Sequence, residues 1–239
     1  MKPAIVAATI LTVAAGAASA QSVIRLATEG AYPPYNLIDD SGKVAGYDVD
    51  VGDAVCAHAH LTCEWVTNDW DSIIPNLVSG NYDAILAGMS MTEEREKVID
   101  FTQNYLKPEP SSYVAASSDV DVKHGVIAAQ TGTIQAAFVQ ESGATLVEFA
   151  TPEETVAAVR NGEADAVLAD KSYLVDYVNE DPDLAFVGED VFLGNGLGIG
   201  VRQSDTDLRD KLDAALAEMK KDGSLNALID KWMPNSEHF

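Results

Sequence analysis

The sequence predicts an α/β protein of two lobes, each a mixed sheet flanked by helices. Two series of strand–helix units follow one another along the chain, and such units build sheets with parallel strands. Extended segments near 106–111 and 188–194 join the two series, which predicts two crossings between lobes, and two amphipathic helices end the chain. We therefore expect the first lobe at 21–108, the second lobe at 109–190, and a return to the first lobe at 191–239.

The N-terminus has the pattern of a secretory signal peptide over residues 1–20. Lys2 supplies a positive charge, Ala4 to Ala15 is largely apolar, and Ala18-Ser19-Ala20 fits the small-residue cleavage rule. The mature chain should begin at Gln21. No later segment approaches the ~18 apolar residues of a membrane span, so we expect an exported, periplasmic protein.

The charge balance argues against several classes of partner. Asp and Glu number 38 against 15 Lys and Arg, a formal charge of −23. Nucleic acids and anionic membranes require positive charge on the protein, so neither is an expected partner. Cationic ligands are mildly favoured.

The first series contains three strands, each followed by a polar or aromatic loop. We expect strands at Val23–Thr28, Cys63–Val66 and Ala84–Ala87, a hairpin turn at Asp40–Lys43, and helices at Asp48–Ala59 and Ser72–Gly80. The loops carry Tyr32, Trp70, and Ser90 with Arg95. Ligands of open α/β sheets bind at the carboxyl ends of strands, where these loops should meet. Asp48 serves equally well as a helix N-cap.

The stretch from Asp83 to Arg95 is suited to holding an anion. Gly88 lets the chain turn closely, Ser90 or Thr92 can cap a helix, and Arg95 offers a planar fork to a carboxylate. An ordinary strand, a capped helix and a surface arginine would explain the same residues.

The second series repeats this plan. We expect its strands at Val126–Gln130, Thr145–Phe149, Ala164–Leu168 and Leu184–Val187. We expect its helices from Thr133 to Glu141, at Pro152–Arg160 and at Lys171–Asn179. A glycine-rich strand within Leu193–Val201 should follow, and then the two final helices at Asp205–Lys221 and Leu225–Trp232. Segment 100–113 reads as an extended connection. Thr133 either caps its helix or contributes to a second anion site, and Asp170 either caps a helix or meets a ligand ammonium.

The cysteines are Cys56 and Cys63, and a disulfide is the default in an exported protein. His58 and His60 lie between them, but the spacing matches no zinc-ribbon pattern and the bridge would use both sulfurs. We expect no metal and no cofactor.

Several motifs in this order resemble the periplasmic solute-binding proteins of polar amino acid ABC transporters, the group with lysine/arginine/ornithine-, histidine- and glutamine-binding members. The resemblance covers Ile24 to Trp232. Its carriers are Tyr32-Pro33-Pro34-Tyr35, Gly42-x-x-x-Gly46-Tyr47-Asp48-x-Asp50, Trp70-Asp71-x-x-Ile74-Pro75-x-Leu77, Asp83-Ala84-x-x-Ala87-Gly88-Met89-Ser90-x-Thr92-x-x-Arg95, Thr131-Gly132-Thr133 and Ala164-Asp165-Ala166-x-x-x-Asp170.

This resemblance implies a type II periplasmic binding protein clamshell that closes by hinge motion on one amino acid. Arg95, Ser90 and Thr133 would hold the ligand carboxylate, and Asp170 with the Ser90 hydroxyl would hold the α-ammonium. Tyr32 and Trp70 would sandwich the ligand side chain, and Glu29 and Asp48 would face its distal charge. The implied ligand-binding set is Glu29, Tyr32, Asp48, Trp70, Gly88, Ser90, Arg95, Thr133 and Asp170.

The resemblance leaves the ligand open. Glu29 and the cysteine pair favour arginine, lysine or ornithine, whereas Ala87-Gly88 resembles the glutamine-binding proteins; histidine and an arginine-derived opine are further alternatives. The expected partner is a membrane permease, and we expect a monomer. A rival is an exported dehydratase acting on prephenate or arogenate, but each candidate acid, Glu29 or Asp170, already has a binding role and no histidine accompanies the cleft motifs.

Overall fold

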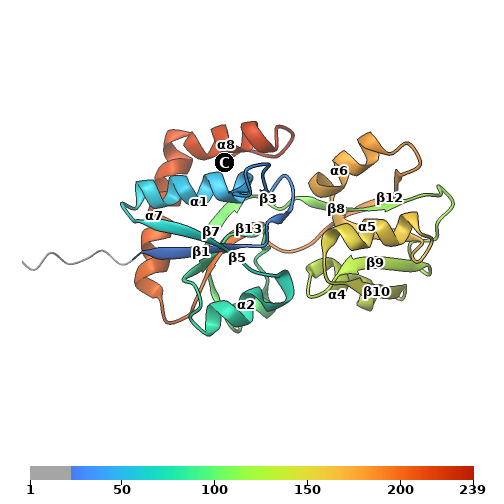
Figure 1. The fold of residues 1–239 in the computed structure, drawn as a ribbon, viewed down its shortest axis with the longest axis horizontal. Coiled ribbons are helices and arrows are strands. Elements are labelled where there is room, and N and C mark those ends of the chain that lie inside the picture. Colours follow the sequence, from blue (N-terminus) through green and yellow to red (C-terminus); the bar gives the residue numbers. More distant parts are fainter. Residues whose placement is uncertain (1–22) are drawn as a thin grey trace, which may run out of the picture.

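A computed structural model describes residues 23–239 of the chain. Two lobes lie side by side, each with a sheet covered by helices above and below (Figure 1). The predicted signal peptide, residues 1–20, lies outside the described residues. Among residues 23–239, no helix combines the length and apolar character needed to span a membrane.

The first lobe contains a five-stranded sheet in the order β5-β1-β6-β13-β7. Strand β1 runs parallel to β5 and β6, while β13 runs antiparallel to β6 and β7. Its strands are β1 (Ile24–Thr28), β5 (Cys63–Thr67), β6 (Ala84–Ile85), β7 (Asp100–Leu106) and β13 (Leu197–Val201), and a smaller sheet holds β2 (Ala31–Tyr32), β3 (Asn36–Ile38) and β4 (Val44–Ala45). Its helices are α1 (Tyr47–His58), α2 (Trp70–Val78), α3 (Glu93–Glu96), α7 (Thr206–Asp222) and α8 (Ser224–Trp232).

The second lobe repeats this plan with the order β10-β9-β11-β8-β12. Strands β10, β9 and β11 are parallel, and β8 runs antiparallel to β11 and β12. Its elements are β8 (Pro110–Ala115), β9 (Val126–Gln130), α4 (Ile134–Ser142), β10 (Thr145–Phe149), α5 (Pro152–Arg160), β11 (Ala166–Asp170), α6 (Lys171–Glu180) and β12 (Ala185–Phe192). Both sheets thus place the first strand of their series between the second and the third.

Two segments connect the lobes, one between β7 and β8 and the other between β12 and β13. An extended connection was expected over residues 100–113. This expectation was incomplete, because most of these residues form the strands β7 and β8. The second crossing was expected too early. Residues 188–192 belong to β12, whose pairing with β8 continues beyond an irregularity between Val187 and Val191.

Alternation along the strands builds a core on each face of each sheet. In β1, Leu26 packs with Val55 and Leu216 on the face covered by α1, α7 and α8, whereas Ala27 packs with Ile73 and Leu77 of α2 on the opposite face. The second lobe divides in the same way between α5 with α6 and α4. Period-two side-chain alternation explains why each sheet needs helices on both faces.

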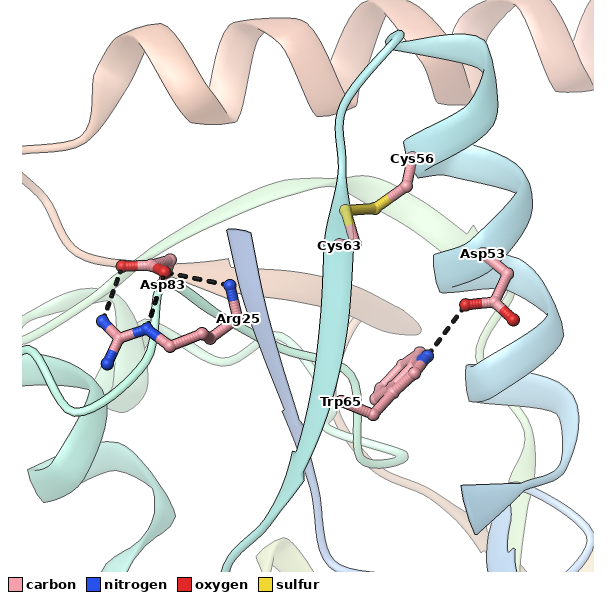
Figure 2. Close-up of a disulfide and its surroundings, with 6 residues drawn as sticks. All are labelled: Arg25, Asp53, Cys56, Cys63, Trp65 and Asp83. Carbon is pink, nitrogen blue, oxygen red and sulfur yellow. Dashed lines mark hydrogen bonds and ion pairs between the residues drawn. A yellow bond between two sulfur atoms is a disulfide. The ribbon is translucent and has the colours of Figure 1, made fainter. Parts of the chain in front are cut away.

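The predicted disulfide between Cys56 and Cys63 is confirmed. It joins α1 to the start of β5, with the Cα atoms 6.3 Å apart (Figure 2). In the same view, Trp65 of β5 donates a hydrogen bond to Asp53 of α1, 2.8 Å long. The bridge and this bond therefore fasten the same helix to the edge strand β5.

The helix starts near the cavity agree with the sequence at two positions and differ at a third. Thr92 accepts a bond from the Arg95 backbone (3.2 Å), and Thr133 accepts one from the Ala136 backbone (3.1 Å), so both are N-caps. Asp48 is not the N-cap of α1. The N-cap is Gly46, whose φ of 119° lies in a region that favours glycine. The Asp48 carboxylate is therefore available to other hydrogen-bond donors.

Candidate functional site

A cavity lies between the two lobes. Residues from the loops after β1, β6, β9 and β11 surround it, as expected for the carboxyl ends of strands. The cavity is lined by Glu29, Tyr32, Trp70, Ala87, Gly88, Ser90, Arg95, Gln130, Thr133, Ile134, Gln135 and Asp170. Most of the residues selected from the sequence therefore lie around one space.

Arg95 supplies the positive charge of this cavity. Its guanidinium donates to the backbone carbonyls of Ser90 (2.8 Å) and Gly132 (3.3 Å) and lies 5.2 Å from the Trp70 ring centre. Burial lowers the Arg95 pKa to about 10, and the nearby Asp170 opposes that shift, so the group stays cationic at neutral pH. Both hydrogen-bond partners are neutral, which leaves the guanidinium charge able to pair with an anion.

The start of α4 approaches Arg95 from the second lobe. Thr133 caps this helix, and its hydroxyl donates to the Gln130 carbonyl at 2.7 Å. Gly132 just before it has φ 71°, which brings the backbone close to the Arg95 side chain. The N–H groups of a first helical turn add positive potential next to the guanidinium.

Asp170 supplies a carboxylate at the end of β11. It accepts from the Tyr32 hydroxyl at 2.9 Å and from the Gln135 amide at 3.1 Å, with the Ser111 hydroxyl at 3.5 Å. Burial raises the Asp170 pKa to about 6, while the Tyr32 bond and the Arg95 charge hold it down. Since Tyr32 belongs to the first lobe, its bond to Asp170 crosses between lobes.

Glu29 lies just beyond β1 and provides a second carboxylate. It accepts one side-chain hydrogen bond, from the Gln130 amide at 2.7 Å. Burial raises the Glu29 pKa to about 7; the Gln130 bond lowers it and Asp69 raises it. A partly buried carboxylate with a single neutral donor is short of partners for its negative charge.

The two aromatic residues predicted to sandwich the ligand side chain, Tyr32 and Trp70, both line the cavity and also contact other side chains. Tyr32 stacks on Tyr35, at 5.4 Å between ring centres, and on Tyr173 of α6, at 4.4 Å. Trp70 instead carries the Arg95 guanidinium over its ring. Tyr32 thus joins the lobes through ring packing as well as through its bond to Asp170.

Asp48 is the predicted site residue that does not line the cavity. Its carboxylate is fully buried and accepts from the Tyr105 hydroxyl (2.6 Å), the Asn36 amide (2.9 Å) and the Gly88 backbone (2.7 Å). It therefore holds the loop at Gly88, which does line the cavity, from behind. The structure places it one layer away from the space that a ligand would occupy.

Four lining residues are absent from the ligand-binding set that the resemblance implies: Ala87, Gln130, Ile134 and Gln135. Gln130 is the last residue of β9, a place equivalent to Asp170 at the end of β11. Gln135 lies in the first turn of α4, two residues after the predicted Thr133. A rule that selects polar residues at strand ends and first helical turns would have found both glutamines.

The fold and the cavity define a two-lobed binding protein that surrounds a small ligand with charged groups from both lobes. Comparison with known proteins identifies the family. The model of bacterial extracellular solute-binding proteins, family 3, matches residues 24–235, and the chain belongs to this family.

Curated relatives and a solved structure agree with this assignment. A putative ABC transporter arginine-binding protein 2 of Escherichia coli is 34% identical over 97% of this chain and 99% of its own length. The L-arginine-binding protein of Pseudomonas aeruginosa is 33% identical over 90% and 89%. A periplasmic His/Glu/Gln/Arg/opine family-binding protein from Silicibacter pomeroyi, solved in complex with lysine, is 62% identical with a TM-score of 0.88, over 90% of this chain and all of that one.

Proposed function

We propose that the protein binds a cationic L-amino acid, lysine or arginine, between its lobes and delivers it to the membrane permease of an ABC importer. The observation that carries the proposal is the set of charges in the cavity: Arg95 on one side, with Asp170 and Glu29 as two carboxylates. An amino acid zwitterion would match Arg95 and Asp170. Glu29 then remains, and a second positive charge on the ligand would balance it.

The roles of the individual groups follow from their geometry. The ligand carboxylate would pair with the Arg95 fork, near the first turn of α4 and close to Ser90. The α-ammonium would donate to Asp170. The side chain would extend toward Glu29, where a guanidinium or ammonium pairs with the carboxylate and can lie against the Trp70 ring. Buried charges are costly unless paired, so a matched ligand gains affinity from every one of these contacts.

Hinge closure would follow from the same arrangement. Arg95 and Glu29 come from the first lobe and Asp170 from the second, so a single ligand bridges the lobes. A ligand shifts an open–closed equilibrium by its difference in affinity for the two states. The relatives named above support this reading, since both names specify arginine, the name of the Escherichia coli relative specifies an ABC transporter, and the solved structure holds lysine.

Export, monomeric state and permease docking complete the proposal. The signal-peptide pattern of residues 1–20 would send the mature chain, from Gln21, to the periplasm. The rim of both lobes would contact the permease in the closed form. We infer binding without turnover, because the acids that could act on a dehydratase substrate already serve in the charge match.

Calorimetry of the mature chain tests the ligand class. The protein should first be unfolded and refolded to remove bound ligand, then titrated with lysine, arginine, ornithine, histidine, glutamine, citrulline and octopine. We expect one site, with lysine and arginine much tighter than glutamine and citrulline. Tight binding of glutamine alone would contradict the cationic assignment, and formation of product from prephenate or arogenate would contradict the absence of turnover.

A further inference from the structure

The hydrogen bond between Glu29 and Gln130 connects the two lobes inside the cavity. Glu29 follows β1 of the first lobe, and Gln130 ends β9 of the second. The Gln130 amide nitrogen lies 2.7 Å from Glu29 Oε1, and Gln130 as a residue is only 7% exposed. Both side chains line the cavity. The contact is therefore available to the ligand and depends on the lobes being together.

The orientation of the Gln130 amide is fixed by its neighbours. Its nitrogen donates both to Glu29 and to the backbone carbonyl of Ala150, at 3.1 Å. Both neighbours are acceptors, so a rotated amide would place its oxygen against two other oxygens. The carbonyl oxygen of Gln130 consequently stays free of these two contacts, and it is available as a hydrogen-bond acceptor within the cavity lining.

We propose that Gln130 is a positioning residue that makes the site selective for a ligand with a distal positive charge. It holds the Glu29 carboxylate across the lobes and adds its own carbonyl oxygen as a second acceptor. This inference rests on the proposed function, because it assigns the side-chain end of the same site. Guanidinium and ammonium groups carry only donors and match two acceptors, whereas the oxygen of a neutral amide or urea meets no donor there.

The charges around Glu29 fit this role. Asp69, at the start of α2, disfavours the Glu29 anion, and Tyr173 of α6 is close enough for Glu29 to affect its pKa. Arg95 and Asp170 line the same cavity. Of the groups that act on the Glu29 pKa, Gln130 is the one that stabilises the carboxylate anion. Without it, the carboxylate would hold a proton to higher pH and lose its attraction for a cation.

Gln130→Leu removes the amide with little change in volume, and arginine with citrulline forms the matched ligand pair. Citrulline replaces the guanidinium by a neutral urea of nearly the same shape. At pH 8 we expect the variant to bind arginine about tenfold more weakly or worse, the usual cost of losing a hydrogen bond to a charge, and citrulline with a much smaller change. Gln140→Leu, an exposed glutamine on α4 of the same lobe, serves as the control and should bind both ligands as the unaltered protein does.

The pH profile separates positioning from simple packing. Arginine affinity should rise with pH and level off above about pH 7 in the unaltered protein, near the Glu29 pKa. In Gln130→Leu the levelling should move to higher pH. An equal loss of affinity for arginine and citrulline at every pH, with an unmoved profile, would overturn the proposal, as would unchanged selectivity.

A second measurement follows Glu29 itself with the lobes held closed by saturating citrulline, because the Gln130 contact requires the lobes to be together and citrulline brings no distal charge to Glu29. The Glu29 carboxyl carbon can be titrated by NMR in the unaltered protein, in Gln130→Leu and in Gln140→Leu. We expect a higher Glu29 pKa in Gln130→Leu alone. An equal Glu29 pKa in all three proteins would overturn the inference, whereas failure of the unaltered protein to bind any cationic amino acid would overturn the proposed function instead.

Discussion

Two buried acidic regions of the first lobe differ in how fully their carboxylates are satisfied. The Asp48 region is closed, since Asp48 accepts from Tyr105, Asn36 and Gly88 and is fully buried. The Glu29 region opens into the cavity, and its carboxylate has Gln130 as its side-chain donor. Burial raises both pKa values, to about 6 for Asp48 and about 7 for Glu29.

Burial and a raised pKa therefore do not mark a ligand site by themselves. Perturbed acids occur in structural networks as well as in functional sites. The number of internal donors separates the two cases here. Asp48 has its hydrogen-bonding capacity largely used by the fold, so removing it should cost stability, whereas Glu29 and its neighbours keep capacity for a ligand and their removal should cost affinity.

The largest expected effect is the loss of ligand affinity when Arg95 is removed from the cavity. Arg95→Ala removes the charge that would meet the ligand carboxylate, and losing one partner of a buried charge pair costs about 3–5 kcal/mol. Calorimetry should therefore show arginine or lysine affinity reduced by at least about a hundredfold. Thermal unfolding should change little. Arg209→Ala, which removes a surface arginine paired with Asp100, is the control for affinity; an equal loss in both variants would contradict the assignment of Arg95.

The second prediction concerns the contribution of Asp48 to the stability of the fold. Asp48→Asn replaces one of the two acceptor oxygens by an NH2 group that cannot accept, so at least one of the three buried donors around Asp48 loses its acceptor, and we expect the free energy of unfolding to fall by about 2–3 kcal/mol. Urea denaturation measures this change, and arginine affinity should change far less than in Arg95→Ala. The matched control is Asp53→Asn on the same helix, an exposed acid bonded to Trp65 (Figure 2). Loss of affinity with unchanged stability would place Asp48 in the ligand site and contradict its structural role.

The smallest effect concerns the pH dependence of stability without ligand. Glu29 has a pKa near 7 in the folded protein and 4.5 as its ordinary value, so the folded state binds the proton more tightly. The stability that the folded state gains from this tighter proton binding at Glu29 is fully present below about pH 4.5. It is lost as the pH rises to about 7. Glu29→Gln should remove on the order of 2 kcal/mol of this decline.

Urea denaturation at pH values from 4.5 to 8 checks that expectation. Asp48 and Asp170 also have raised pKa values, near 6, so both proteins should still lose stability over part of this range. The informative quantity is the difference between the two curves. Parallel curves would show that Glu29 has the same pKa in the folded and the unfolded protein. The Glu29 carboxylate would then not be short of partners in the fold, which would contradict the contrast with Asp48.

Much of the fold could be predicted because local patterns fix it. The strands at Val126–Gln130 and Thr145–Phe149 and the helix at Pro152–Arg160 begin and end where the sequence placed them, since apolar runs, turn residues and caps lie next to one another in the chain. The Ala84–Ala87 strand proved shorter, at Ala84–Ile85. The Pro-containing segment 100–113 was harder to predict, because β7 pairs with the distant β13, and β8 pairs with the distant β11 and β12.

The sequence by itself determined the two strand–helix series, the disulfide, the family and the charged residue types of the cavity, because these depend on local spacing and on composition. Only the tertiary contacts show which acids face the cavity, that Gln130 meets Glu29 across the lobes, and that Tyr32 packs on Tyr173. These contacts join residues about 100 positions or more apart. Their existence depends on how the two lobes meet, which no local sequence pattern specifies.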